Sequence, residues 1–372
     1  MNPLEQRIIG KIRKEGPVTF ESYMEMALYE PGLGYYASES TEIGRAGDFY
    51  TSQHLHPAFG ALIAKQIEEM WEVLGKPPDF HIIEPGAGAG LMCMDIMNYL
   101  CKKQIYHSLS YVIVEKNFFI EQKQKKLLET YQDKIRWISA ISELRAIKGC
   151  VLSNELLDAF PVHLIEMREQ LKELCVTVDN GSFHEIHGPL STVAIEEYLK
   201  EFSVDLPYGY RTEINLRIKD WLYAVGEALS EGFIFTIDYG YPAQDYYSEE
   251  RNTGTLLCYF RHQFGENPYI NVGNQDMTAH VNFSSVKKWG EDLGFATVGF
   301  CQQGTFLVSL GIDEIIKELY ENSKDYLFEV AKIKRLIFPG TLGETHKVMI
   351  QYKGKADPKL RGFSMKNQKD RL

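Results

Sequence analysis

The stretch FHIIEPGAGAG, residues 80–90, joins a short apolar run to a turn with three alternate glycines, and it decides the predicted fold. Such a run, followed by a glycine-rich turn and a helical pattern, is typical of the first strand–turn–helix unit of an α/β sheet. Further apolar runs, LSYVIVE (109–115), GCVLSN (149–154) and GFIFTIDYG (232–240), alternate with helical segments. Fully apolar strands between helices indicate a parallel sheet covered on both faces. The sequence therefore predicts a doubly wound α/β core.

Changes in pattern along the chain predict the organisation around this core. Residues 1–79 read as a helical region with one long irregular loop, and residues 80–161 and 231–353 as the Rossmann-like core. Residues 162–230 read as an insert, in which an antiparallel hairpin turns at Asp-Asn-Gly and helices follow. Residues 354–372 are polar and lack periodicity, so we expect a flexible tail.

The glycine spacing favours one class of ligand. A dinucleotide fingerprint is G-x-G-x-x-G, whereas Gly86, Gly88 and Gly90 give G-x-G-x-G. Glu84 at the end of the strand would repel a pyrophosphate but could bind a cationic amino-acid head group. Glu115 ends the next strand, where it could accept hydrogen bonds from both ribose hydroxyls. These features predict S-adenosylmethionine as the cofactor; the structural alternative is that the turn only packs the sheet tightly.

A second group of polar residues follows the run GCVLSN. Asn154, Glu155 and Asp158 come just after this buried strand, and the two acids are three positions apart, so on a short helix they would share a face. Carboxylates in such a pair could orient a guanidinium, whose pKa is above 12, and draw its charge away from the attacking nitrogen. Alternatively, Asn154 caps a helix and the acids favour its positive end.

Two later segments supply further candidates. Asp238 ends the run GFIFTIDYG at the same predicted edge of the sheet, although an acid there is also a common turn former. His280, in GNQDMTAHVNF, could relay a proton or could be a hydrogen-bonded core histidine, and we favour the structural role slightly. The sequence has no G-x-S-x-G elbow, P-loop or H-E-x-x-H motif, so hydrolase, nucleotide-triphosphatase and zincin functions lack support.

Composition limits the partners. The chain has 372 residues and a formal net charge of −11, which argues against nucleic acid as the main partner because phosphate binding relies on a basic surface. The six cysteines are scattered without paired or metal-type spacing, and we expect reduced core thiols and no metal site. No run approaches the length needed to span a bilayer, and no signal-type segment begins the chain. We expect a soluble cytoplasmic protein.

Ten sequence blocks in the same order resemble the MidA-type methyltransferases, the family that includes the mitochondrial complex I assembly protein-arginine methyltransferase. The match runs from about residue 23 to residue 349. The blocks are MALYEPGLGYYAS, IGRAGDFYTS, EPGAGAG, YVIVE, LSNELLDAFPVH, IDYGYP, GTLLCYFRH, DMTAHVNF, QQGTFLVSLGI and LGETHKVM.

The resemblance implies a class I S-adenosylmethionine-dependent fold, with a protein arginine as methyl acceptor in the mitochondrial branch. It also implies that Gly47, Asp48, Thr51 and Ser52 of the long loop fold over the cofactor.

Three functions follow in order of preference. In the first, Glu84, the glycines, Glu115 and Asn154 hold S-adenosylmethionine, while residues 154, 155, 158 and 238 receive an arginine of a protein client. The second keeps the cofactor but takes a small metabolite, in a pocket formed by Tyr246, Tyr247, Tyr259 and Phe260. The third is an assembly chaperone with a vestigial cofactor fold, because fold alone does not establish catalysis. A dinucleotide oxidoreductase is a distant fourth, and a homodimer remains open.

Overall fold

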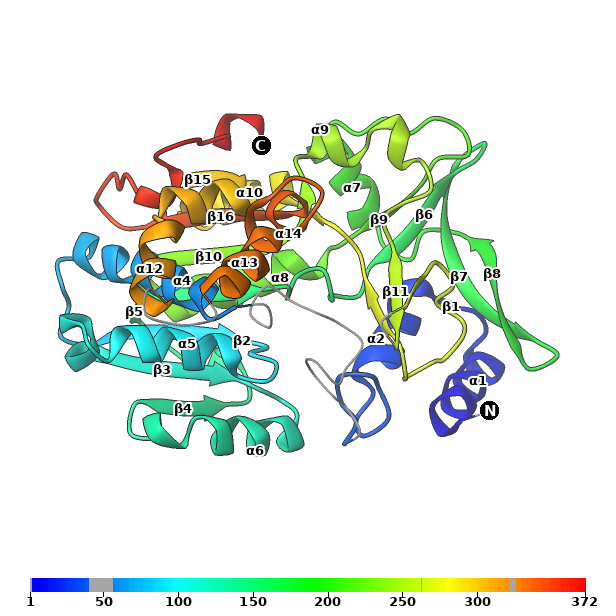
Figure 1. The fold of residues 1–372 in the computed structure, drawn as a ribbon. Coiled ribbons are helices and arrows are strands. Elements are labelled where there is room, and N and C mark those ends of the chain that lie inside the picture. Colours follow the sequence, from blue (N-terminus) through cyan, green and yellow to red (C-terminus); the bar gives the residue numbers. More distant parts are fainter. Residues whose placement is uncertain (1, 40–55, 262, 321–325) are drawn as a thin grey trace. The chain divides into compact units, whose positions relative to one another are not determined.

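A computed structural model describes residues 2–39, 56–261, 263–320 and 326–372 (Figure 1). The chain forms two compact units, each assembled from separate stretches of sequence. Unit 1 comprises Met1–Phe49, Leu157–Asp220 and Tyr241–Ser285, and unit 2 comprises Tyr50–Leu156, Trp221–Gly240 and Val286–Leu372. Within the described residues, no helix is both long enough and apolar enough to cross a membrane.

Unit 2 contains the predicted α/β core. Its main sheet has the strand order β15-β16-β10-β5-β2-β3-β4, in which neighbouring strands from β10 to β4 run parallel and β16 is antiparallel to both of its neighbours (Figure 1). The strands in this order are β2 (Phe80–Pro85), β3 (Leu109–Val114), β4 (Ile135–Ile138), β5 (Ile147–Asn154), β10 (Leu229–Tyr241), β15 (Ala296–Gln302) and β16 (His346–Lys353).

The helices of this unit cover the sheet because its strands are apolar on both faces. Ile82 and Leu152 pack into one core together with α4, α5 and α11 to α13, while their neighbours Ile83 and Val151 are buried outside that cluster. The helices are α4 (Ala58–Val73), α5 (Leu91–Leu100), α6 (Phe118–Leu127), α10 (Phe283–Asp292), α11 (Gln303–Ser309), α12 (Ile312–Tyr320), α13 (Tyr326–Ile337) and α14 (Leu342–Thr345). The doubly wound core predicted from the sequence is confirmed.

Unit 1 is built on antiparallel strands. One sheet has the order β1-β7-β6-β9 with β8 paired to β7, and a smaller one has the order β12-β11-β13. Its elements are α1 (Pro3–Glu15), β1 (Val18–Thr19), α2 (Phe20–Tyr29), β6 (His163–Met167), β7 (Leu171–Asp179), β8 (Ser182–Gly188), α7 (Ala194–Glu201), β9 (Arg211–Ile214), α9 (Ala243–Tyr246), β11 (Leu257–Phe260), β12 (Gln263–Gly265), β13 (Asp276–Thr278) and β14 (Val281–Asn282). Helix α8 (Arg217–Ala228) carries the chain from unit 1 into unit 2.

The predicted hairpin is confirmed as β7 and β8. The turn residues Asn180 and Gly181 have φ of 49° and 82°, as a two-residue type I′ turn requires. Asparagine tolerates this left-handed conformation and glycine adopts it without steric cost, so the dipeptide fixes the register of the hairpin.

The unit boundaries differ from the predicted ones. The N-terminal 79 residues do not form one region, since α1 and α2 belong to unit 1 and α4 to unit 2. Residues 241–285, predicted as part of the core, also belong to unit 1, where the short strands β11 and β13 pair with each other. Strands of three or four residues carry too little periodicity for the sequence to separate them from core strands.

The prediction of a flexible C-terminal tail is wrong. Leu360 and Phe363 are buried in the core of unit 2, and the Phe363 ring lies 5.3 Å from that of Phe306 and against Gly299. The backbone N–H of Gln368 donates to the Phe300 carbonyl at 2.7 Å. Two apolar residues in a polar segment give no periodic signal, so only packing reveals that the tail is docked.

Replacing Phe363 by Ala should lower the free energy of unfolding by about 2 kcal/mol, below the roughly 3–5 kcal/mol of a central Phe because the segment can detach. Met365→Ala is the matched control, because that side chain is 64% exposed and should change stability little. Urea unfolding measures both. Equal midpoints for the two variants would contradict a docked tail.

All six cysteines are free thiols. Cys93, Cys150, Cys258 and Cys301 are buried, as predicted for core residues. Cys101 is exposed at the end of α5, so the core assignment is wrong for this residue.

Candidate functional site

The glycine-rich turn follows β2 and leads into α5. Gly86, Gly88 and Gly90 have φ of 65°, 55° and 82°, a left-handed conformation that side chains rarely adopt. Gly90 is the N-cap of α5, and its N–H donates to the Ala87 carbonyl at 2.8 Å. The left-handed backbone of the turn therefore favours glycine at these three positions, where the turn has no Cβ atom.

Glu84 ends β2 as a buried carboxyl group. The Tyr111 hydroxyl donates to its Oε2 at 2.7 Å. Burial raises the pKa of Glu84 to about 7, and the Tyr111 hydrogen bond opposes that shift. A carboxyl group in this state would be stabilised as the anion by a bound cation.

Glu115 follows β3, the neighbour of β2, so the two acids come at adjacent strand ends as the sequence predicts. Oε1 of Glu115 accepts from the Asn117 N–H at 2.8 Å, and Oε2 lies 3.4 Å from Nε2 of Gln124. Burial raises the pKa of Glu115, and the backbone N–H groups of Asn117 and Lys116 oppose it. The turn after β3 thus holds this carboxylate in a fixed position.

The sequence reasoning missed Gln124, a buried residue of α6 that links both turns. Its Nε2 donates to the Gly88 carbonyl at 2.9 Å and lies close to Glu115, while its Oε1 accepts from Nε1 of Trp137 at 2.9 Å. Gln124 sits among polar residues in EQKQKKLL, so no sequence pattern distinguishes it.

The residues that follow β5 are hydrogen-bonded to β10. Glu155 has φ of 50°, which is uncommon for a residue with a side chain. Its N–H donates to the Ile237 carbonyl at 2.9 Å, and the N–H of Leu156 donates to Oδ2 of Asp238 at 3.2 Å. Oδ1 of Asp238 accepts from the Tyr239 N–H at 2.8 Å. Asp238 therefore positions the backbone of both strand ends.

This backbone corrects one prediction. Glu155 and Asp158 do not share the face of a helix, because the left-handed Glu155 begins a turn segment and the chain passes from unit 2 to unit 1 after Leu156. The segment forms a single turn, closed by the Phe160 N–H and the Leu157 carbonyl at 3.3 Å, and the proline at position 161 has no N–H to continue it as a helix.

Besides the Ser153 hydroxyl, two oxygen atoms at this strand end, from an amide and a carboxylate, are buried without a hydrogen-bond partner among the described residues. They are Oδ1 of Asn154 and Oε2 of Glu155. The other carboxylate oxygen, Oε1 of Glu155, lies 3.1 Å from Nε2 of His346 and 3.4 Å from Nδ2 of Asn154. Buried acceptors normally have partners, so the two exceptions mark a place for a ligand with N–H or O–H donors.

The other predicted residues lie elsewhere. Asp158 and His280 belong to unit 1, where the N–H of Ala279 donates to the Asp158 carbonyl at 2.9 Å. The N–H of His280 donates to Oγ1 of Thr255 at 3.0 Å, and its ring packs against Tyr241 at 5.4 Å. Asp48, Thr51 and Ser52, like Gly47, lie outside the described residues.

Unit 1 also holds the tyrosines of the predicted small-molecule pocket. Tyr246 donates toward Oε2 of the buried Glu213 at 3.3 Å, and Tyr247 donates to the Tyr198 hydroxyl at 3.1 Å. The rings of Tyr246 and Tyr247 are 4.8 Å apart. These two tyrosines are thus packed against other side chains of their own unit.

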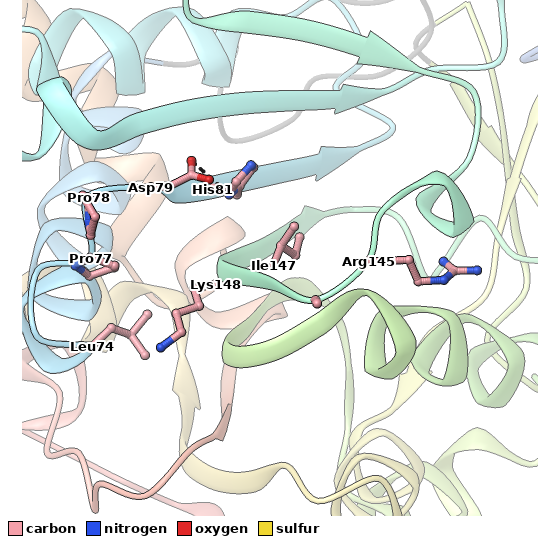
Figure 2. A pocket seen from close by; sticks show the side chains of 9 residues that line it. Leu74, Pro77, Pro78, Asp79, His81, Arg145, Ile147 and Lys148 are labelled. Carbon is pink, nitrogen blue, oxygen red and sulfur yellow. Dashed lines mark ion pairs between the residues drawn. The ribbon is translucent and has the colours of Figure 1, made fainter.

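One cavity of about 620 Å³ opens in unit 2, away from the strand ends described above (Figure 2). Asp79 and His81 line it at the start of β2, and Ile147 and Lys148 at the start of β5, so it lies at the amino ends of these strands. Among the described residues, no group of three His, Cys, Asp or Glu side chains could hold a metal ion.

The residues at the carboxyl strand ends fit S-adenosylmethionine. This molecule carries an ammonium, a sulfonium and a ribose with two hydroxyls, and it has no phosphate. The turn at Gly86, Gly88 and Gly90 has no Cβ atom at these three positions, and the carboxyl groups of Glu84 and Glu115 have pKa values raised by burial. A cation and two hydroxyl donors would offset that cost of burial.

Comparisons with known proteins agree with this fit. The family model described as "Putative S-adenosyl-L-methionine-dependent methyltransferase" matches residues 62–301. The mitochondrial protein arginine methyltransferase NDUFAF7 homolog of Drosophila melanogaster is 24% identical, over 94% of this chain and 85% of the relative. The human NDUFAF7 protein is 25% identical, over 87% of this chain and 77% of the relative.

A solved structure matches the fold as a whole. It is a protein from Burkholderia thailandensis bound to S-adenosylhomocysteine, with a TM-score of 0.91 and 29% identity over 99% of this chain and 96% of that one. The strand order with β16 antiparallel between β10 and β15 is thus the Rossmann-like sheet of a methyltransferase. The matched residues are more than half of the chain, so this protein belongs to the MidA-type family of S-adenosylmethionine-dependent methyltransferases.

Proposed function

We propose that this methyltransferase transfers the methyl group of S-adenosylmethionine to an arginine side chain of a protein client. The observation that carries the proposal is the pair of buried, unpartnered oxygens at the end of β5, Oδ1 of Asn154 and Oε2 of Glu155. A guanidinium has five N–H donors in a planar fork and no acceptor, so it is the complement of two such oxygens. The relatives from Drosophila melanogaster and human are named protein arginine methyltransferases, which supports the same acceptor.

The residues divide into two roles in this proposal. Glu84, the three glycines and Glu115 would hold S-adenosylmethionine, in which a positively charged sulfur carries the methyl group and is a good leaving group. Asn154 was also predicted to contact the cofactor, but its unpartnered Oδ1 is assigned here to the acceptor. Because the leaving group is already activated, the protein has mainly to place and desolvate the nucleophile.

Glu155 has the central role toward the acceptor. Its Oε2 accepts an N–H of the guanidinium, which localises positive charge away from the attacking nitrogen. The S–CH₃ bond breaks as the N–CH₃ bond forms, and the product guanidinium must lose one proton to keep its single charge. Oε2 of Glu155 is the proposed acceptor of that proton before it passes to water.

Asp158 and His280 are the remaining residues that the sequence analysis predicted for the acceptor. Asp158 is a buried carboxylate, and its own backbone carbonyl is bonded to the segment that carries His280. Both are proposed to contact the client rather than the cofactor.

The acceptor can be identified directly. Purified enzyme and tritiated S-adenosylmethionine are added to an extract of cells that lack this gene, and acid-precipitable protein is hydrolysed for amino-acid analysis. We expect the label in methylated arginine. Label in methyl-lysine, or only in acid-soluble metabolites, would contradict an arginine acceptor, and loss of label with Glu155→Gln but full client assembly in cells would indicate a chaperone role.

A further inference from the structure

We propose that His346 is a positioning residue for methyl transfer, which holds the Glu155 carboxylate so that only its Oε2 faces the acceptor. The inference rests on the proposed role of Glu155. Nε2 of His346 lies 3.1 Å from Oε1 of Glu155, and the exposed fractions of the two side chains are 0% and 5%. The contact is therefore shielded from water, and a hydrogen bond to a carboxylate is stronger in such a buried place than in water.

The direction of this hydrogen bond follows from the partner. A carboxylate oxygen can only accept, so Nε2 must carry the proton. Nδ1 of His346 lies 3.3 Å from Oγ1 of Thr345, whose one hydroxyl proton can also be donated to the Thr341 carbonyl at 3.4 Å.

The imidazole ring is itself held in place. His346 is the first residue of β16 and lies opposite Tyr239 of β10 in the antiparallel pair. The two ring centroids are 4.0 Å apart, which fixes the plane of the imidazole. A ring held by this tilted aromatic contact and by Thr345 can fix the orientation of a neighbouring carboxylate.

Glu155 needs such a partner because only its backbone is anchored by β10. The hydrogen bond from its N–H to Ile237 fixes the left-handed backbone but leaves the side-chain torsions free. Nε2 of His346 and Nδ2 of Asn154 both approach Oε1, and no described residue donates to Oε2. Oε1 is therefore the oxygen that His346 and Asn154 hold, and Oε2 is the oxygen assigned to the acceptor.

Two variants test the role of His346. Phe fits beside Tyr239 but has no donor, whereas Gln can place an N–H near the position of Nε2. With saturating S-adenosylmethionine and extract protein as the acceptor, His346→Phe should lower kcat/KM about 10- to 100-fold, and His346→Gln should recover most of it. The affinity for S-adenosylmethionine, measured by calorimetry, should stay within about twofold of the wild type in both variants.

A double-mutant cycle separates positioning from a general structural effect. In the Glu155→Gln background, His346→Phe should change the remaining rate by less than about twofold, because its effect passes through the Glu155 carboxylate. An undiminished loss in that background would overturn the proposal. So would a His346→Phe enzyme with wild-type kcat/KM.

A crystal structure of His346→Phe distinguishes failure of this inference from failure of the proposed function. We expect the Glu155 carboxylate to leave its wild-type position, and an unmoved carboxylate would overturn the positioning role whatever the acceptor is. If the wild-type enzyme labels lysine or no protein at all, arginine methylation fails, but this structural comparison still decides the role of His346. Thermal melting of each variant shows whether it is folded.

Discussion

Glu155→Gln should lower the rate of methyl transfer to protein about 100- to 1000-fold, which corresponds to about 3–4 kcal/mol of transition-state stabilisation. The substitution keeps the shape of the side chain but removes the negative charge that would polarise the guanidinium. It also places an amide where Nε2 of His346 and Nδ2 of Asn154 approach the wild-type carboxylate. Cofactor affinity should change little, because Glu155 is assigned to the acceptor.

Single-turnover rates measure this effect, and Glu231→Gln is the matched control. Glu231 lies near the start of β10, at the opposite end of the same sheet, and pairs with Lys148 at 2.7 Å. Its replacement should leave the rate within about twofold, since exposed ion pairs contribute little. A Glu155→Gln rate within threefold of the wild type would remove Glu155 from the transfer step.

The second large effect concerns Glu84, whose replacement by Gln should weaken S-adenosylmethionine binding about 100-fold, or about 2.7 kcal/mol. With a pKa of about 7, Glu84 is roughly half protonated in the free protein at pH 7. A bound ammonium favours the anion, so binding should release about half a proton at that pH. Affinity should then be about fivefold weaker at pH 6 than at pH 7.

Calorimetry in buffers of different ionisation enthalpy measures the released proton. The groups around Glu84 are Tyr111 and Cys93, whose own pKa values are raised by burial, so neither titrates near pH 7. Asp95→Asn is the control, because burial also raises the pKa of Asp95 to about 7 but this residue of α5 is not assigned to the cofactor. Proton release that persists in Glu84→Gln, or disappears in Asp95→Asn, would contradict the assignment.

The same shift sets a pH dependence of stability in the free protein. The pKa of Glu84 rises from 4.5 to about 7 on folding, so the folded state binds the proton more tightly than the unfolded chain. Stability is therefore greatest below about pH 4.5 with respect to this group and falls as the pH rises to about 7, by up to about 3 kcal/mol. Glu84→Gln should remove this part of the pH dependence.

Local sequence signals predicted much of the fold. The runs at residues 80, 109, 149 and 232 became β2, β3, β5 and β10 because apolar strands buried on both faces have a composition that sets them apart. The glycines at positions 86, 88 and 90 and the Asn180–Gly181 turn were readable because left-handed backbone selects these residues. Such signals depend on neighbours in the chain.

Features that depend on distant residues were not readable in this way. The pattern around Glu155 and Asp158 fits a helix locally, but the hydrogen bond from Leu156 to Asp238 turns the backbone there. The docked tail and the buried Gln124 likewise gain their contacts from elements far away in sequence.

The sequence by itself determined a doubly wound α/β sheet, its glycine turn and the acids at its strand ends, because each is encoded in a few adjacent residues. The tertiary structure decided which atoms of those acids have partners. His346 reaches Glu155 only because β16 pairs antiparallel with β10, which joins positions 191 residues apart. A contact of that kind depends on strand pairing across the whole sheet, and no local pattern in the sequence records it.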